Sequence, residues 1–190
     1  KKKLNKKSCL SSLKSISNRG PDKIKYQFFL DNKLFIANTI LSIIPKLDNS
    51  SNLYRTDDKR FFGSYNGEIY NFNELKQKNK NKIKFKTSDN DTKTLIKLHQ
   101  YFSPLQIVKN LKGMFAYLIF DSKKKKIYYA TDTQGEKKLF KYEDENLFIL
   151  SSTVKGILSV DGVKKKFNKE TKKDYFKTRH FLIQNSIYKN

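Results

Sequence analysis

Cysteine and histidine are scarce in this 190-residue chain. It contains one cysteine, Cys9, and two histidines, His99 and His180. A single cysteine excludes an internal disulfide, and so few thiol and imidazole ligands exclude a zinc cluster of the usual kind. We therefore expect no metal site made from these side chains.

Glycine is also scarce, with seven residues scattered along the chain. None of them falls in a GxGxxG pattern or in GxxxxGK followed by Ser or Thr, the two loops that hold phosphates with glycine backbone. The sequence therefore contains no recognisable nucleotide-binding loop. We expect these residues to bind no cofactor.

Long hydrophobic runs are absent. No apolar stretch approaches the roughly 20 residues that a membrane-spanning helix needs, and KKKLNKKS at the start is not followed by the apolar core of a signal peptide. Hydrophobic residues still make up 37% of the chain, which is enough for one domain with a real core. We expect a single globular cytoplasmic unit with no membrane partner.

Acidic residues are few beside the basic ones: 18 Asp and Glu against 41 Lys and Arg, with a formal net charge of +23. Such a charge favours phosphate backbones, so a nucleic-acid surface is the first rival interpretation. Arginine, whose fork suits phosphates and base edges, occurs only at Arg19, Arg55, Arg60 and Arg179. The lysines are spread over the whole chain, and the run at 123–126 reads as a solvated turn. We therefore do not expect nucleic acid as the partner.

Hydrophobic periodicity predicts alternating short helices and strands. Helices are expected at 8–17, where Gly20-Pro21 follows, at 72–79, from 91 onward and in the charged tail after 164. Strands are expected at 25–30, 33–38, 82–87, 113–121, 126–131 and 146–152, and the segment 40–44 extends the second of these or forms its own. Parallel crossover units are few, so the pattern indicates an α+β sandwich.

The stretch SYNGEIYN, residues 64–71, raises a question of geometry. Asn66-Gly67 between β-forming residues is the commonest signal for a tight hairpin, so one interpretation ends the strand there in a type I′ turn. The other interpretation is that glycine lets the backbone approach a ligand closely. The answer depends on the surrounding segments.

Seven segments stand out in order: NRGPD (18–22), ANTILSII (37–44), YNGEIYN (65–71), SDNDTKTLI (88–96), LKGMFAYLIFD (111–121), ATDTQGEKKLF (130–140) and SSTVKGIL (151–158). At this spacing they resemble the glutaminase domain of asparagine synthetases, a class II glutamine amidotransferase domain. The resemblance implies the N-terminal-nucleophile hydrolase fold, an αββα sandwich of two mainly antiparallel sheets flanked by helices, here without its first strand. It divides the chain into an amidotransferase domain at 1–158 and, at 159–190, the start of a connection to a missing synthetase domain.

The resemblance also assigns roles to residues. Asn66 and Gly67 correspond to the oxyanion hole, whose donors must already be in place when a nucleophile attacks the glutamine amide. Glu68 and Asp91 correspond to acids that hold the polar groups of L-glutamine, including its α-ammonium, and Asp89 is the runner-up for Asp91. The backbone of Ile40, Leu41, Ser42, Ile43 and Ile44 corresponds to the wall of the glutamine pocket. We expect the oxyanion donors and an acid from the neighbouring helix to face one shared pocket.

The chain departs from the family pattern at several positions. The family's nucleophile is a cysteine at the mature N-terminus, whereas this sequence starts with Lys1, and Cys9 falls on the first expected helix. Ile40 replaces an arginine that pairs with the glutamine carboxylate, and Asn38 replaces a histidine. The family's RDR is TDT at 131–133, and Thr153 replaces an acid. We expect this fragment alone to be inactive.

The implied reaction of the intact parent is that of an asparagine synthase (glutamine-hydrolysing). Glutamine is hydrolysed through a cysteinyl thioester, and the ammonia amidates aspartate or a related carboxylate, with ATP and Mg used by the missing synthetase domain. Two alternatives stay open. The domain is a degenerate scaffold of an ammonia-dependent ligase, or the chain is a lysine-rich nucleic-acid binder.

Overall fold

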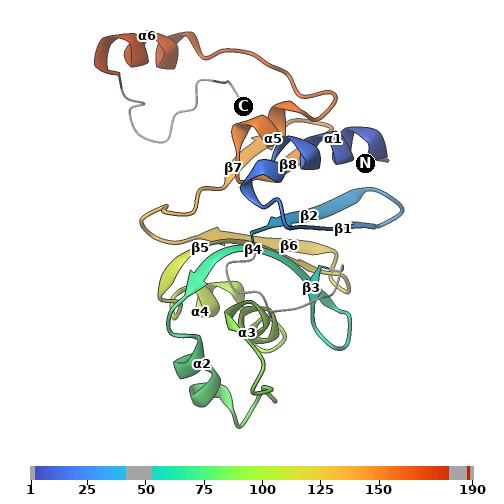
Figure 1. Ribbon diagram of the computed structural model, residues 1–190, viewed down its shortest axis with the longest axis vertical. Helices are drawn as coiled ribbons and strands as arrows, with labels where there is room; N and C mark the ends of the chain where they lie inside the picture. Colours follow the sequence, from blue (N-terminus) through green and yellow to red (C-terminus); the bar gives the residue numbers. More distant parts are fainter. Residues whose placement is uncertain (1–2, 42–52, 180–187, 189–190) are drawn as a thin grey trace.

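The computed structural model describes residues 3–41, 53–179 and 188. Two layers of antiparallel strands lie between two layers of helices (Figure 1). One helical layer holds α1 (Lys6–Ser15) and α5 (Val154–Leu158), and the other holds α2 (Phe72–Asn79), α3 (Asp91–Leu98) and α4 (Pro104–Val108). The expected α+β class and αββα arrangement are confirmed.

The larger sheet has four strands in the order β3 (Tyr54–Arg55), β4 (Phe61–Ile69), β5 (Gly113–Asp121) and β6 (Lys126–Thr131). All neighbours are antiparallel. Because this sheet is covered on both faces, β5 reads as a nearly continuous apolar run and not as an alternation. The expected strands at 113–121 and 126–131 are confirmed, with the lysine run in the turn between them.

The other strand layer consists of two hairpins. β1 (Lys23–Phe29) pairs with β2 (Leu34–Ile40), and β7 (Phe140–Glu143) pairs with β8 (Phe148–Ser151). Among the described residues, β2 has a ladder only with β1, and β8 only with β7. The second long edge of β2 and that of β8 are therefore not covered by a strand within the described part of the chain.

The hydrophobic core is divided by the four-stranded sheet. On one face, Leu95 and Leu98 of α3 pack against Phe61 and Ile119. On the other face, Ile36 of β2 packs against Phe62 and Phe120, which lie on β4 and β5. Since successive residues of a strand point to opposite faces, β4 sends its side chains alternately toward α3 and toward the β1–β2 hairpin.

The expected helices form; α1, α3 and α6 (Lys169–Thr178) each have an asparagine side-chain cap, whereas Asn71 before α2 makes no cap hydrogen bond. Asn90 precedes α3, and its side chain accepts the N–H of Lys93, as a cap at this position should. In the tail, α6 is capped by Asn168. Among the described residues, no helix has the length and apolar character required to cross a membrane.

Three details of the sequence prediction differ from the structure. The segment 82–87 alternates like a strand but forms none, because the N–H of Lys86 donates to Asp89 Oδ2 in a local loop. The first helix ends at Ser15, before Gly20-Pro21, and a 3₁₀ turn η1 (Ser17–Arg19) follows. β4 runs through Asn66-Gly67, so no turn ends it there.

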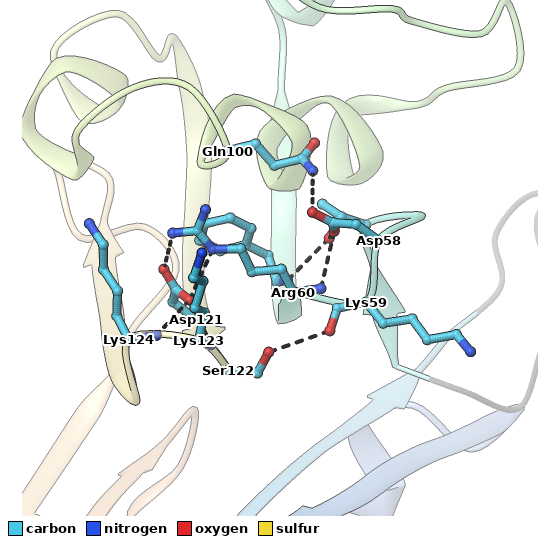
Figure 2. Close-up of polar contacts among 10 residues, drawn as sticks. Asp58, Lys59, Arg60, Gln100, Asp121, Ser122, Lys123 and Lys124 are labelled. Carbon is cyan, nitrogen blue, oxygen red and sulfur yellow. Dashed lines mark hydrogen bonds and ion pairs between the residues drawn. The ribbon is translucent and has the colours of Figure 1, made fainter.

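A polar cluster joins the turns at the far end of β4 and β5 (Figure 2). Asp58 accepts hydrogen bonds from the N–H of Arg60 and from Nε2 of Gln100 at the end of α3. The N–H of Ser122 donates to the carbonyl oxygen of Arg60 at 2.9 Å. This cluster fixes the β3–β4 and β5–β6 turns side by side.

Candidate active site

Asn66 lines a cavity of about 420 Å³. The cavity lies between the four-stranded sheet and the two hairpins, and its walls include residues 34–39 and 148–152, which are consecutive along β2 and around β8. Ser64 also lines it, and its hydroxyl donates to the carbonyl oxygen of Ala37 at 3.2 Å. Ser64 and Asn66 of β4 therefore face the cavity, and Asn66 is the one whose amide can donate into it.

Gly67 lies in the middle of the β4–β5 pairing, opposite Phe115. Its φ is +134°, and a Cβ built there would collide with the backbone carbonyl oxygen of Met114. Only glycine tolerates this backbone conformation at so close an approach. The Asn66-Gly67 pair is thus held inside a paired strand.

Tyr65 precedes Asn66 and points to the opposite face, toward α3. Its hydroxyl donates to Asp91 Oδ2 at 2.6 Å. Its carbonyl oxygen accepts from Nδ2 of Asn38 on β2, at 3.3 Å. Burial, reinforced by the neighbouring Asp91 carboxylate, raises the pKa of the Tyr65 hydroxyl far above its usual range. Tyr65 therefore stays a hydrogen-bond donor at physiological pH.

The two candidate acids lie at the C-terminal end of β4. Glu68 is exposed and shares the strand face of Asn66 by alternation. Asp91 approaches from α3: its Oδ2 also accepts the N–H of Ile69 at 3.3 Å, and its Oδ1 accepts the N–H of Thr92 at 2.7 Å. The structure thus does not bring Asp91 into the cavity that Asn66 lines; it places Asp91 at the end of β4, on the other face.

Asp89, the runner-up for Asp91, is buried in a structural role. Its Oδ2 lies 2.6 Å from Nζ of Lys97 and accepts the N–H of Lys86. Burial opposes ionisation, but these donors prevail and lower the pKa of the Asp89 carboxyl. Asp89 thus stays ionised while it closes the loop before α3.

The segment 40–44 is described only in part. Ile40 ends β2, and Gly20 packs so closely on its backbone that a Cβ at Gly20 would collide with it. Leu41 is 57% exposed. Neither residue is among those lining the cavity, whereas Asn38 and Thr39 are. Ser42, Ile43 and Ile44 lie outside the described residues.

Two groups near the site were not singled out as site residues in the sequence. The buried Asp132 accepts four backbone N–H groups, from Phe115, Gln134, Glu136 and Lys137. Burial opposes the charge, but these donors lower the pKa of Asp132. Because Phe115 lies opposite Gly67, Asp132 fixes the strand against which Gly67 packs. In the sequence, the signal for such a buried acid is an aspartate placed between the end of a strand and a turn that contains glycine, here Gly135.

Asn38 is the second such group, and its asparagine amide donates to the Tyr65 carbonyl. Its own signal in the sequence was its place in the segment 37–44. Cys9 also lines the cavity, from α1, but burial raises the pKa of its thiol. A protonated thiol is a poor nucleophile, so Cys9 is a core residue.

Comparison with known proteins places this geometry in a family. A family model described as "Glutamine amidotransferase domain" matches residues 1–190. The chain belongs to this family of glutamine amidotransferase domains.

Two curated relatives are asparagine synthetases by name. The chain is 34% identical to a putative asparagine synthetase [glutamine-hydrolyzing] 2 of Methanocaldococcus jannaschii, over 93% of the chain and 37% of the relative. It is also 34% identical to asparagine synthetase [glutamine-hydrolyzing] 2 of Bacillus subtilis, over 81% of the chain and 20% of the relative. The chain thus spans well under half the length of these relatives.

A solved structure shows the same fold. Glutamine phosphoribosylpyrophosphate amidotransferase from B. subtilis superposes with a TM-score of 0.58 at 18% identity, covering 80% of this chain and 40% of that one. This likeness shows that the chain has the N-terminal-nucleophile hydrolase fold.

Proposed function

We propose that this chain is the glutamine-hydrolysing part of an asparagine-synthetase-like amidotransferase. The observation that carries the proposal is the placement of Asn66 and Gly67: an amide side chain lining a cavity, followed by a glycine locked inside a paired strand. Donors that are fixed before the reaction stabilise a developing oxyanion without reorganisation, which is the largest electrostatic contribution in acyl transfer.

The chemistry follows from those donors. A cysteine thiolate attacks the side-chain amide carbon of glutamine, and the carbonyl oxygen becomes an oxyanion facing the Asn66 amide and the Gly67 N–H. Collapse of this intermediate expels ammonia after protonation of its nitrogen and leaves a thioester. Water then hydrolyses the thioester to glutamate and restores the thiol.

The cavity suggests where the cysteine is carried. The edges of β2 and β8 both border it, and apolar side chains such as Ile36, Leu118 and Leu150 line it. A strand lying between these edges could pair with both and complete one continuous sheet, because neither edge has a partner strand in the described part of the chain. We place the cysteine-bearing strand of the family there, beside Asn66.

The rest of glutamine would extend toward the end of β4. Its α-ammonium would pair with Glu68, on the strand face of Asn66, and would approach Asp91 only around the end of β4, since a carboxylate is the natural partner for a cation. Ile40 offers no charge to the α-carboxylate, so we expect weaker binding of glutamine than an arginine would give. The missing ion pair corresponds to about 1.5–3 kcal/mol.

The remaining parts of the proposal concern the whole protein. The domain would end at 158, where α5 ends after packing against α1 and β8. Residues 159–190, including α6, would begin the connection to a synthetase domain that uses ATP and Mg to amidate aspartate or a related carboxylate. We place this protein in the cytoplasm.

The test is glutamate release from the 190-residue chain preceded by a Met-Cys-Gly strand, compared with the chain alone and with Met-Ser-Gly in place of Met-Cys-Gly. Turnover is expected only with the cysteine strand. A folded, cysteine-bearing protein that binds glutamine but releases no glutamate would reject hydrolysis. That result would favour the degenerate scaffold of an ammonia-dependent ligase, an alternative to which the replacements Ile40 and Thr153 point.

A further inference from the structure

Tyr65 is held on both faces of β4 by side chains from different layers. On the hairpin side, Asn38 Nδ2 of β2 donates to its carbonyl oxygen at 3.3 Å. On the helical side, its hydroxyl donates to Asp91 Oδ2 of α3 at 2.6 Å. Within the described residues it therefore joins the hairpin, the four-stranded sheet and α3 at one point.

The two contacts act on two different groups of the site. The Tyr65 carbonyl belongs to the peptide bond whose nitrogen is that of Asn66, so the Asn38 contact sets the tilt of the backbone that carries the oxyanion donor. The hydroxyl instead holds one oxygen of Asp91. That carboxylate also accepts the N–H of Ile69 and both the N–H and the hydroxyl of Thr92, so four donors fix its position at the end of β4.

We propose that Tyr65 is a positioning residue that aligns both halves of the site: Asn66 through its carbonyl oxygen and Asp91 through its hydroxyl. This inference rests on the proposed function, because it assigns Asn66 to the oxyanion and Asp91 to the α-ammonium. Tyr65 touches neither glutamine nor the nucleophile. Its effect on the reaction passes through its two neighbours.

The two contacts predict losses in different kinetic constants. Tyr65→Phe removes only the hydroxyl and frees the Asp91 carboxylate, so the KM for glutamine is expected to rise about tenfold with kcat within about twofold. Asn38→Ala frees the Tyr65 carbonyl, so kcat is expected to fall about tenfold with a smaller change in KM. Both are measured as glutamate release by the protein carrying the cysteine strand.

Tyr117→Phe is the matched control. Tyr117 lies directly opposite Tyr65 on β5, is buried, and has no hydrogen bond from its hydroxyl among the described residues. It should leave both constants within about twofold of wild type. Kinetics of Tyr65→Phe that match those of Tyr117→Phe would overturn the proposal, as would equal losses in KM and kcat for Tyr65→Phe and Asn38→Ala.

A second measurement does not depend on activity. A double-mutant cycle of Tyr65→Phe with Asp91→Ala, read by urea unfolding, should show coupling, and Asp91→Asn serves if Asp91→Ala fails to fold. If wild type hydrolyses no glutamine but the cycle shows coupling, the proposed function fails and the Tyr65–Asp91 contact stands. Absence of coupling overturns the positioning role whatever the activity.

Discussion

Arg60 donates two parallel hydrogen bonds to the Asp121 carboxylate, from Nε at 3.1 Å and from Nη2 at 2.8 Å (Figure 2). The Asp121 side chain is only 1% exposed, and it also accepts the N–H groups of Lys123 and Lys124. The Arg60 hydrogen bonds lower the pKa of Asp121. Arg60 thus joins the start of β4 to the end of β5. Asn66 and Gly67 lie toward the other end of β4.

Breaking this pair should destabilise the fold. Asp121→Asn leaves the Arg60 guanidinium without its anion, and we expect a loss of about 3 kcal/mol in the free energy of unfolding. Arg60→Lys, the control, keeps the positive charge but loses the paired hydrogen bonds of the guanidinium. It should lower the free energy of unfolding by less than Asp121→Asn does. Because the folded pKa of Asp121 is depressed, its contribution is present above the unfolded pKa and is lost as pH falls. Equal unfolding midpoints in urea for wild type and Asp121→Asn would contradict this.

The burial of His99 predicts a second dependence of the free energy of unfolding on pH. Its ring is packed among those of Phe61, Tyr117 and Tyr128, and its Nε2 has no hydrogen-bond partner among the described residues. Burial lowers the pKa of His99 from 6.5 to about 4. Since the unfolded chain binds the proton more readily, stability should fall by about 3 kcal/mol as pH drops through that window.

The variant His99→Phe removes the titrating group while it keeps an aromatic ring. Its unfolding free energy should depend less on pH between 4 and 6.5 than that of wild type, when both are measured by urea unfolding at several pH values. Parallel curves for the two proteins would show that His99 is not the group responsible. Asp121 adds its own loss at the acidic end of the range in both proteins.

Gly67→Ala should fail for a steric reason. The new Cβ would meet the Met114 carbonyl at a φ of +134°, and we expect a cost of at least about 2 kcal/mol. Gly135→Ala is a matched control, because Gly135 also has a positive φ, of +67°, but nothing lies within 4 Å of its Cβ position. Thermal unfolding should separate the two variants. If Gly67→Ala is as stable as Gly135→Ala, the backbone of β5 at Met114 lies further from Gly67 than the structure shows.

Asn66→Ala tests the oxyanion donor. In the protein carrying the cysteine strand, we expect kcat for glutamine hydrolysis to fall about 100-fold, because one fixed donor is lost from the transition state. Asn66→Asp, which keeps the shape but replaces the donor by an acceptor, should fall at least as far. Unfolding measurements on both variants control for folding. A kcat within threefold of wild type for either variant would remove Asn66 from the mechanism.

Local signals predicted much of the fold. The capping residues before Asp91 and the apolar stripe of Leu95 and Leu98 gave α3. The apolar run at 113–121 indicated β5, because it is short, rich in aromatic residues and bounded by Gly113 and the lysine turn. The short pairing of β7 was missed because FKYE at 140–143 has only four residues, too few for its alternation of aromatic and charged residues to stand out.

Tertiary contacts decided what local signals could not. Lys82 to Thr87 alternates like a strand, but Asp89 captures the N–H of Lys86 and leaves only Ile83 buried. Asn66-Gly67 is a hairpin signal in isolation, yet nine-residue pairing with β5 continues through it. The placement of Tyr65 and Asn66 on opposite faces follows from that pairing. It leaves Glu68 on the face of Asn66 and Asp91 beside Tyr65 on the other face, which no spacing in the sequence revealed.

The exposed long edges of β2 and β8 carry a liability for handling the protein. Within the described residues neither edge is paired with another strand, and each lies beside an apolar wall, which is the template on which a second copy can add. Stored concentrated without a strand between these edges, the chain should self-associate through them, and oligomers would lengthen with concentration. Preparations would then need dilute conditions and an added strand to stay monodisperse.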